Sequence, residues 1–315
     1  MIRSFWSDTD CEIWLSIEAL QALQIVTNWV PGVLSPRLEV FNWASPHTMR
    51  DILGPAMASL YPHFMSLFLA PTVIDLDINV DTQHLLYSTL IQSQSKALHS
   101  RLKVLAITDY EEEGRGPKDM LFIHNYLTSG VWTHLESLQL PGEVDSQYLT
   151  SSTLSHIASL PRLAKLELSS YIDQPSLEHP NSRQEPQFYG LPGEAFPSLR
   201  ELKLRCTTIP GIAKALQHFP PTNKVANLEC SADGPTSHEE TQRVLGIVAR
   251  HFNRNALKVL GLVIGRPMDI SPATNLEPDD NDGLYITPLL AFNKLIKLNF
   301  DISTNLRSLT PELLR

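Results

Sequence analysis

The chain has 315 residues, of which 43% are hydrophobic and 19% are charged, a balance typical of a folded protein that argues against wholesale disorder. Its formal net charge of −9 argues against a nucleic-acid-binding groove, because such grooves usually carry an excess of lysine and arginine. No apolar run reaches the roughly 18 residues of a membrane span. We therefore expect neither a nucleic acid nor a membrane as partner.

The start of the chain and its cysteines indicate a reducing compartment. The first ten residues lack the apolar core of a secretory signal. Cys11, Cys206 and Cys230 lie far apart, and no C-x-x-C motif occurs. Cys230 takes the place of an inward-facing leucine in one of the repeats described below, which predicts a buried free thiol. We therefore expect a cytoplasmic or nuclear protein.

The first predicted element is a helix within residues 11–30. Asp8, Thr9 or Asp10 is its expected N-cap, and Pro31-Gly32 is the expected stop. Apolar residues at helical spacing predict one buried helical face, made of Ile13, Trp14, Ile17, Leu20, Leu23 and either Val26 or Ile25.

Nine copies of one phrase, L-x-x-L-x-L or a close variant, follow this helix. The phrase is the strand signature of a leucine-rich repeat, and its alternation sends two side chains to one face of a strand and the residue between them to the other. The copies begin 26 to 38 residues apart, at Leu38, Val73, Leu102, Leu135, Leu163, Leu199, Val225, Leu257 and Leu295.

The gaps between the phrases each have room for one helix and two loops. Two of the gaps hold polar inserts, residues 173–187 and 266–283, which we expect to be surface loops. Ser237-His-Glu-Glu240 is a capping box at the start of one predicted helix. Apolar residues at helical spacing mark four of the gaps, within residues 81–98, 154–160, 209–219 and 237–252.

Strand, helix and strand at this period predict an α/β fold of one kind: an irregular leucine-rich-repeat solenoid. In this horseshoe, parallel strands line the concave face and helices cover the convex face. Three inward apolar side chains per phrase supply a core that needs neither disulfides nor metal. The Asn or Cys that often follows the strand in such repeats is absent, so we expect no continuous asparagine ladder.

Side chains between the inward leucines are expected on the concave face, where opposite charges meet on neighbouring strands. Lys165 should face Glu201, and Lys203 should lie between Glu167 and Glu229. Two interpretations are open: a solvated ladder that fixes the strand register, or a mixed-charge platform for a protein or peptide partner. The candidate protein-binding residues are Asp75, Asp77, Gln139, Lys165, Glu167, Glu201, Lys203, Arg205 and Glu229.

The sequence holds no recognisable catalytic, cofactor-binding or metal-binding motif. Neither H-E-x-x-H nor G-x-S-x-G occurs, and Gly114 and Gly116 lack the spacing of a phosphate loop. The acidic stretch at residues 277–283 has no carboxylate at the first or twelfth position of a calcium loop. We therefore expect no enzyme activity, no cofactor and no metal site.

Three phrases with their preceding residues, 35–43, 160–168 and 196–204, resemble the leucine-rich portion of fungal F-box proteins, the F-box/LRR kind with ribonuclease-inhibitor-like repeats. The resemblance covers about residues 13–315. In that family an N-terminal F-box docks on the Skp adaptor of a cullin ubiquitin ligase, and the repeats receive the protein to be ubiquitinated. The F-box itself is not visible here, because the 37 residues before the first phrase lack its opening L-P-x-E pattern.

We therefore expect an N-terminal helix, residues 1–37, that leads into a leucine-rich-repeat domain, residues 38–315, of about nine units and truncated at both ends. The resemblance implies a non-enzymatic recognition module, a substrate-receptor-like subunit of an SCF-type ubiquitin ligase that binds an unknown client protein. It implies the Skp adaptor as a second partner if an F-box lies upstream. The alternative is a stand-alone leucine-rich-repeat scaffold or inhibitor unrelated to ubiquitin.

Overall fold

The computed structural model describes residues 3–6, 15–43, 60–80, 92–109, 118–141, 151–169, 191, 193–206, 208–232, 238–264 and 285–302. The chain divides into two compact units, and both have an α/β fold. The first unit is Met1–Pro141 with Leu160–Leu163, and the second is Gly142–Ser159 with Ala164–Arg315. Several stretches named in the sequence analysis lie outside the described residues, among them Ser237, the inserts at 173–187 and 266–283, and the glycines at 114 and 116.

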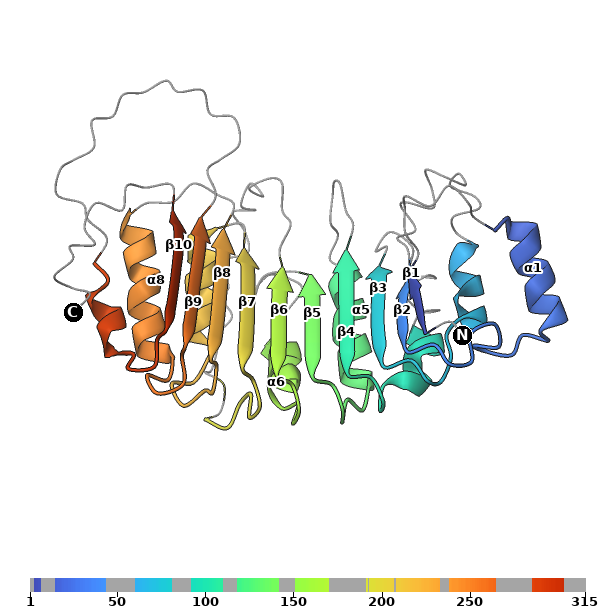
Figure 1. Cartoon of the computed structure of the whole chain (residues 1–315), viewed down its shortest axis with the longest axis horizontal. Coiled ribbons are helices and arrows are strands. Elements are labelled where there is room, and N and C mark those ends of the chain that lie inside the picture. Colours follow the sequence, from blue (N-terminus) through green and yellow to red (C-terminus); the bar gives the residue numbers. More distant parts are fainter. Residues whose placement is uncertain are drawn as a thin grey trace, which may run out of the picture. The chain divides into compact units, whose positions relative to one another are not determined.

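The first unit contains five described strands, all parallel and placed in the sheet in sequence order (Figure 1). The strands are β1 (Ser4–Trp6), β2 (Val40–Trp43), β3 (Asp75–Val80), β4 (Val104–Asp109) and β5 (Ser137–Pro141). Figure 1 shows α5 behind β4. The described helices include α1 (Ile17–Val26) and α5 (Lys118–Ser129), with short 3-10 helices η1 (Tyr61–Leu67) and η2 (Lys96–Leu98).

The second unit repeats this arrangement with five further parallel strands, again in sequence order. They are β6 (Lys165–Ser169), β7 (Glu201–Cys206), β8 (Asn227–Ala232), β9 (Val259–Ile264) and β10 (Lys297–Ile302). Helix α7 packs against β7, β8 and α8. The helices are α6 (Ser151–Ala158), α7 (Ile209–Gln217) and α8 (His238–His251), with the 3-10 helix η3 (Thr287–Ala291). Parallel strands joined through helices confirm the predicted order of elements.

A recurring backbone contact sets the register of these strands. The carbonyl of the residue before one strand accepts hydrogen bonds from two consecutive N–H groups at the start of the next strand. The Ala164 carbonyl accepts from the amides of Arg200 and Glu201 at 2.8 and 2.9 Å, and the Arg200 carbonyl accepts from those of Ala226 and Asn227 at the same distances. Each phrase is therefore aligned with the next position by position, so inward leucines meet inward leucines.

The apolar positions of the phrases form the core, as the sequence predicts for the first eight copies. Their three inward side chains are at most 2% exposed in every one of these eight phrases, and Cys230 is a buried free thiol. The ninth phrase differs from the prediction, because Leu298 is 37% exposed and its neighbours Leu295 and Phe300 are only partly buried. Within the described residues no strand lies beyond β10, so no neighbouring unit covers these side chains.

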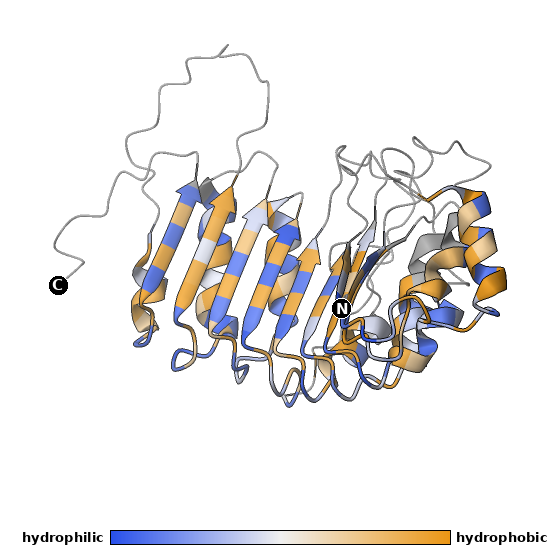
Figure 2. Ribbon diagram, turned by 45° about the vertical axis from the view of Figure 1, so that its right-hand side comes forward, coloured by the Kyte–Doolittle hydropathy of each residue, from blue (hydrophilic) through white to orange (hydrophobic). Residues whose placement is uncertain are grey.

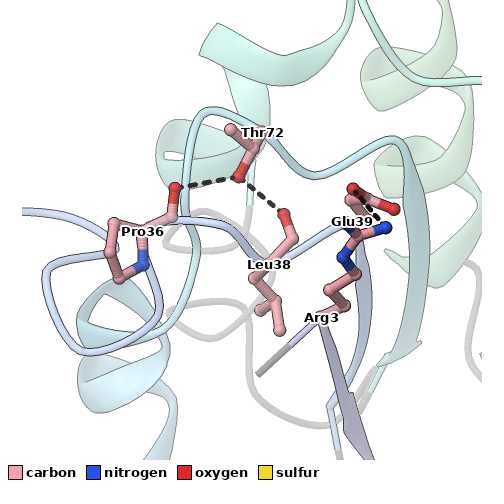
Figure 3. A network of polar contacts seen from close by, with 5 residues as sticks. All are labelled: Arg3, Pro36, Leu38, Glu39 and Thr72. Carbon is pink, nitrogen blue, oxygen red and sulfur yellow. Dashed lines mark hydrogen bonds and ion pairs between the residues drawn. The ribbon is translucent and has the colours of Figure 1, made fainter. Parts of the chain in front are cut away.

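Strand β1 is an element that the sequence analysis did not predict. It runs parallel to β2 with Phe5 opposite Phe41, and their stacked rings have centroids 5.6 Å apart. The sequence Ile2-x-x-Phe5-x-Ser7 matches only two of the three apolar positions of the phrase, which explains why the copy was missed. Figure 3 shows the ion pair that Arg3 forms with Glu39 at 3.8 Å, between the starts of the two strands.

The turn before β3 is tied to the turn before β2 by one hydroxyl. Thr72 Oγ1 donates to the Leu38 carbonyl at 2.7 Å, and it also lies 3.3 Å from the Pro36 carbonyl (Figure 3). Short polar bonds of this kind satisfy carbonyl groups that lie outside the ladder of the sheet. The Thr72 hydroxyl therefore helps to hold the start of β3 beside the start of β2.

Helix α1 begins later than the sequence predicts. Ser16 is its N-cap, with Oγ accepting from the Ala19 amide at 3.2 Å, so the prediction of Asp8, Thr9 or Asp10 as the cap is wrong. Ile17, Leu20 and Gln24 are buried, and the predicted Leu23 is only partly buried. The prediction that Val26 or Ile25 completes the buried face is wrong, because their side chains are 83% and 71% exposed. Ile13 and Trp14 lie outside the described residues. Across the described part of the chain, no helix is both long enough and apolar enough to cross a membrane.

Candidate protein-binding face

All nine candidate residues lie on the strand face opposite to the buried leucines. Strand alternation places them there, because each is next to an apolar residue that points into the core. Figure 2 shows this alternation as hydrophilic and hydrophobic bands along the strands. In the first unit the candidates are Asp75, Asp77 and Gln139, and in the second they are Lys165, Glu167, Glu201, Lys203, Arg205 and Glu229.

The shortest ion pair on this face joins β7 to β8. Lys203 and Glu229 are directly opposite in register, and Nζ of Lys203 lies 2.8 Å from Oε2 of Glu229. Donation to this carboxylate raises the pKa of Lys203 above its usual value. The register also places Lys203 opposite Glu167, as predicted. Lys203 is thus held between two carboxylates and bonded to one of them.

A second ion pair runs diagonally between β6 and β7. Nη2 of Arg205 lies 3.4 Å from Oε1 of Glu167. The Glu167 side chain is only 9% exposed, so this carboxylate is not part of a freely solvated ladder. A carboxylate removed from water needs a compensating positive charge, and Arg205 supplies it. The Arg205 side chain itself is 49% exposed, so part of the guanidinium faces solvent.

The predicted third pair does not form an ion pair. Lys165 and Glu201 are opposite in register, as the sequence indicates. Within the described residues, however, no contact within 4.0 Å joins their charged groups. Register alone brings two long side chains near each other, but the loss of rotamer entropy opposes a fixed contact at an exposed site.

A buried hydroxyl lies next to these charges. Ser169, at the end of β6, is opposite Arg205 in register and on the same face as Glu167. Its Oγ is buried and forms no hydrogen bond in this structure. An unsatisfied buried hydroxyl costs roughly 1–3 kcal/mol, and a polar group of a bound partner would remove that cost. The sequence analysis missed this residue, because a serine at the end of a strand carries no signal for burial.

The first unit carries two carboxylates on adjacent outward positions of β3. Burial, together with the negative charge of Asp75, raises the pKa of Asp77 to about 6, whereas the hydrogen bond from the Asn42 amide opposes this shift. Nδ2 of Asn42 donates to Oδ2 of Asp77 at 2.6 Å. Burial also raises the pKa of Asp75. In the part of the chain that the structure describes, neither carboxylate is paired with a cation.

Asn42 belongs to the candidate face although sequence reasoning omitted it. It occupies the outward position of β2 directly opposite Asp77. The signal was present in the sequence, since Asn42 is the fifth residue of the first phrase and Asp77 is the fifth residue of the second. Aligning the fifth residues of all the phrases, including the first phrase, would have identified Asn42.

Among the described residues, no group of three or more His, Cys, Asp or Glu side chains is arranged to hold a metal ion. In the second unit, the two ion pairs hold charged groups at defined positions on neighbouring strands. In the first unit, the hydrogen bond from Asn42 does the same for Asp77. Comparison of the sequence with models of known protein families and with curated proteins finds no match.

Proposed function

We propose that this chain is a non-enzymatic protein–protein recognition module, a leucine-rich-repeat solenoid that acts as a substrate-receptor-like subunit of an SCF-type ubiquitin ligase. One observation carries the proposal: the outward strand positions hold charged side chains in fixed pairs, Lys203 with Glu229 and Arg205 with Glu167. These side chains lie on neighbouring strands of one sheet.

The repeat supports the solenoid part of the proposal. The phrases recur every 26 to 38 residues, and each described strand is parallel to the next in sequence within its unit. Units that contact only their neighbours form elongated stacks, and the exposed strand face of such stacks commonly binds other proteins. The horseshoe shape and the link to ubiquitin rest on the resemblance to F-box/LRR proteins.

The charge arrangement favours a partner with both positive and negative groups. Lys203, Arg205, Glu167 and Glu229 together carry no net charge, so a purely basic or purely acidic partner gains little from them. Because these side chains are already paired, they lose little conformational freedom when a partner binds, which lowers the entropy cost of binding. Arg205 retains exposed N–H donors, which suit a carboxylate of the client.

Affinity purification from native extract with the full chain tests this proposal. The informative variant is Arg205→Glu, and the matched control is Arg254→Glu, an exposed arginine of the same unit that lies outside the strand face. Recovery of a client and of ubiquitin-ligase subunits, with the client lost in Arg205→Glu and kept in Arg254→Glu, is the expected result. Recovery of a client without ligase subunits favours a stand-alone scaffold or inhibitor. Recovery of neither contradicts both functions.

A further inference from the structure

Helix α1 and the turn after it present an apolar surface to solvent. Six apolar side chains, each between 40% and 83% exposed, form what we call the α1 patch: Leu15, Ile25, Val26, Trp29, Val30 and Val33. The buried side of the helix uses different residues, Ile17, Leu20 and Gln24, so the α1 patch is not part of the core of the unit. Figure 2 shows hydrophobic colour along α1. Exposed apolar patches of this extent mark interaction sites.

The α1 patch is held rigidly on the first unit. Nε2 of the buried Gln24 donates to the His63 carbonyl at 2.9 Å, and the Gly32 amide donates to the Ser66 carbonyl at 2.8 Å. Gly32 has a φ of +66°, and a Cβ added there would lie 2.4 Å from the Cα of Ala70. Only glycine fits this close approach. The helix and its turn are therefore fixed to η1 and the segment that follows it.

Two residues of the turn adopt a backbone conformation that side chains rarely take. Asn28 has a φ of 50° and Trp29 a φ of 59°. Asparagine tolerates this left-handed region, but a tryptophan there is an outlier that costs of the order of 1–3 kcal/mol. The conformation leaves Trp29 mostly exposed. A strained backbone that displays a large apolar ring is the pattern expected at a contact site.

We propose that two copies of this chain pack against each other through the α1 patch, α1 against α1. Each of the six side chains exposes on the order of 100 Å², so complete burial of the α1 patch on two copies would remove about 1,200 Å² from solvent, the lower limit for a specific stable interface. Neighbouring backbone and polar atoms add to this area. In a two-fold interface the same surface of each copy faces its equivalent on the other copy. An apolar patch can meet its equivalent in this way, because no like charges are brought together.

The charge of α1 disfavours other occupants. Its single charged residue is Glu18, which is acidic and lies in the first turn, one helical turn after Leu15. No cation is therefore available to attract an anionic membrane surface, and the net charge of −9 opposes such binding. A strongly charged protein would find no complementary charge here. An uncharged apolar surface, which a second copy supplies, is the best match.

Sedimentation velocity with the purified full chain over a wide concentration range tests the proposal. The test variant is Val26→Asp, and the matched control is Ile296→Asp, which changes an equally exposed apolar residue of the other unit. We expect twice the monomer mass for the wild type, monomer mass for Val26→Asp, and an unchanged dimer for Ile296→Asp. Circular dichroism establishes that each variant is folded, and Ile25→Lys replaces Val26→Asp if the latter is not.

Three results would overturn the proposal. The wild type could be monomeric at every concentration, the patch variants could remain dimeric, or Ile296→Asp could abolish the dimer equally well. A flotation assay with phosphatidylcholine vesicles separates the lipid alternative: a monomeric wild type that binds vesicles through Val26 assigns the patch to a membrane surface instead. None of these results depends on the client of the strand face.

Discussion

Lys203 and Glu229 occupy directly opposite positions on two neighbouring parallel strands, and their charged groups are 2.8 Å apart. The register of the repeat produces this contact, because phrase position five of β7 meets phrase position five of β8. The pair is partly exposed, so water and salt screen it. Its main effect is to orient two charges on the strand face rather than to stabilise the fold.

The Lys203–Glu229 pair should therefore contribute little to stability. We expect Lys203→Ala to lower the free energy of unfolding by less than about 1 kcal/mol, since exposed ion pairs contribute roughly 0.2–1 kcal/mol. Urea unfolding of the two single variants and of Lys203→Ala combined with Glu229→Ala gives the coupling energy. That coupling should shrink in high salt. A coupling of several kcal/mol, insensitive to salt, would contradict this account of the pair.

Removing the charge of Asp77 should stabilise the protein at neutral pH. The pKa of Asp77 is raised from its ordinary value of 3.8 to about 6, so the contribution of this group to stability is full below pH 3.8 and is lost as the pH rises through about 6. Asp77→Asn keeps an oxygen that accepts from Asn42 and removes the charge. Above pH 6 we expect the variant to be more stable by on the order of 1–3 kcal/mol.

Urea unfolding at a series of pH values measures this difference. The gap between Asp77→Asn and the wild type should widen as the pH rises through 6 and should close toward pH 4. Asp301→Asn, which changes an exposed carboxylate on β10, is the control and should follow the wild-type curve. A gap that does not depend on pH would show that the gain has a cause other than the carboxylate charge.

The regular phrases made the strands and their register predictable, whereas side-chain contacts and element ends depended on features that a sequence does not display. Leu166 and Leu202 meet in the predicted alignment because the same backbone bond recurs at each phrase. Strand β1 was missed because its phrase lacks one apolar residue. The burial of Glu167 and the absence of a Lys165–Glu201 ion pair depend on local packing and rotamers. The repeat pattern predicts the strand position and register of a residue, but it does not predict which atoms contact or bury its side chain.

Two glycines should respond in opposite ways to alanine substitution. Gly246 lies inside α8, where an added Cβ would meet no atom within 4 Å, so Gly246→Ala should stabilise the protein by roughly 0.5–1 kcal/mol through helix propensity. Gly32→Ala should destabilise it, because φ is +66° and the Cβ would clash with the backbone of Ala70. Thermal unfolding of the two variants gives the sign of each change in stability. A stabilising Gly32→Ala would contradict the fixed position of the turn after α1.

The same substitution at the same phrase position should have very different effects in β6 and β10. Leu166 and Leu298 are both the second leucine of their phrase, but Leu166 is fully buried and Leu298 is 37% exposed. Leu166→Asp places an unpaired carboxylate in the core, so we expect a loss of about 4 kcal/mol or more and an unfolded array. Leu298→Asp leaves the carboxylate in contact with water, and we expect a loss of about 1–2 kcal/mol and a folded chain.

Circular dichroism and limited proteolysis of the two variants make this comparison. Leu166→Asp should lose its cooperative transition, because each repeat is stabilised by its neighbours and a disrupted β6 removes the support of β7. Leu298→Asp should retain a cooperative transition, because β10 has only β9 as a described neighbour. Equal damage from the two variants would mean that Leu298 is covered in solution by another surface, and that β10 forms part of an interface.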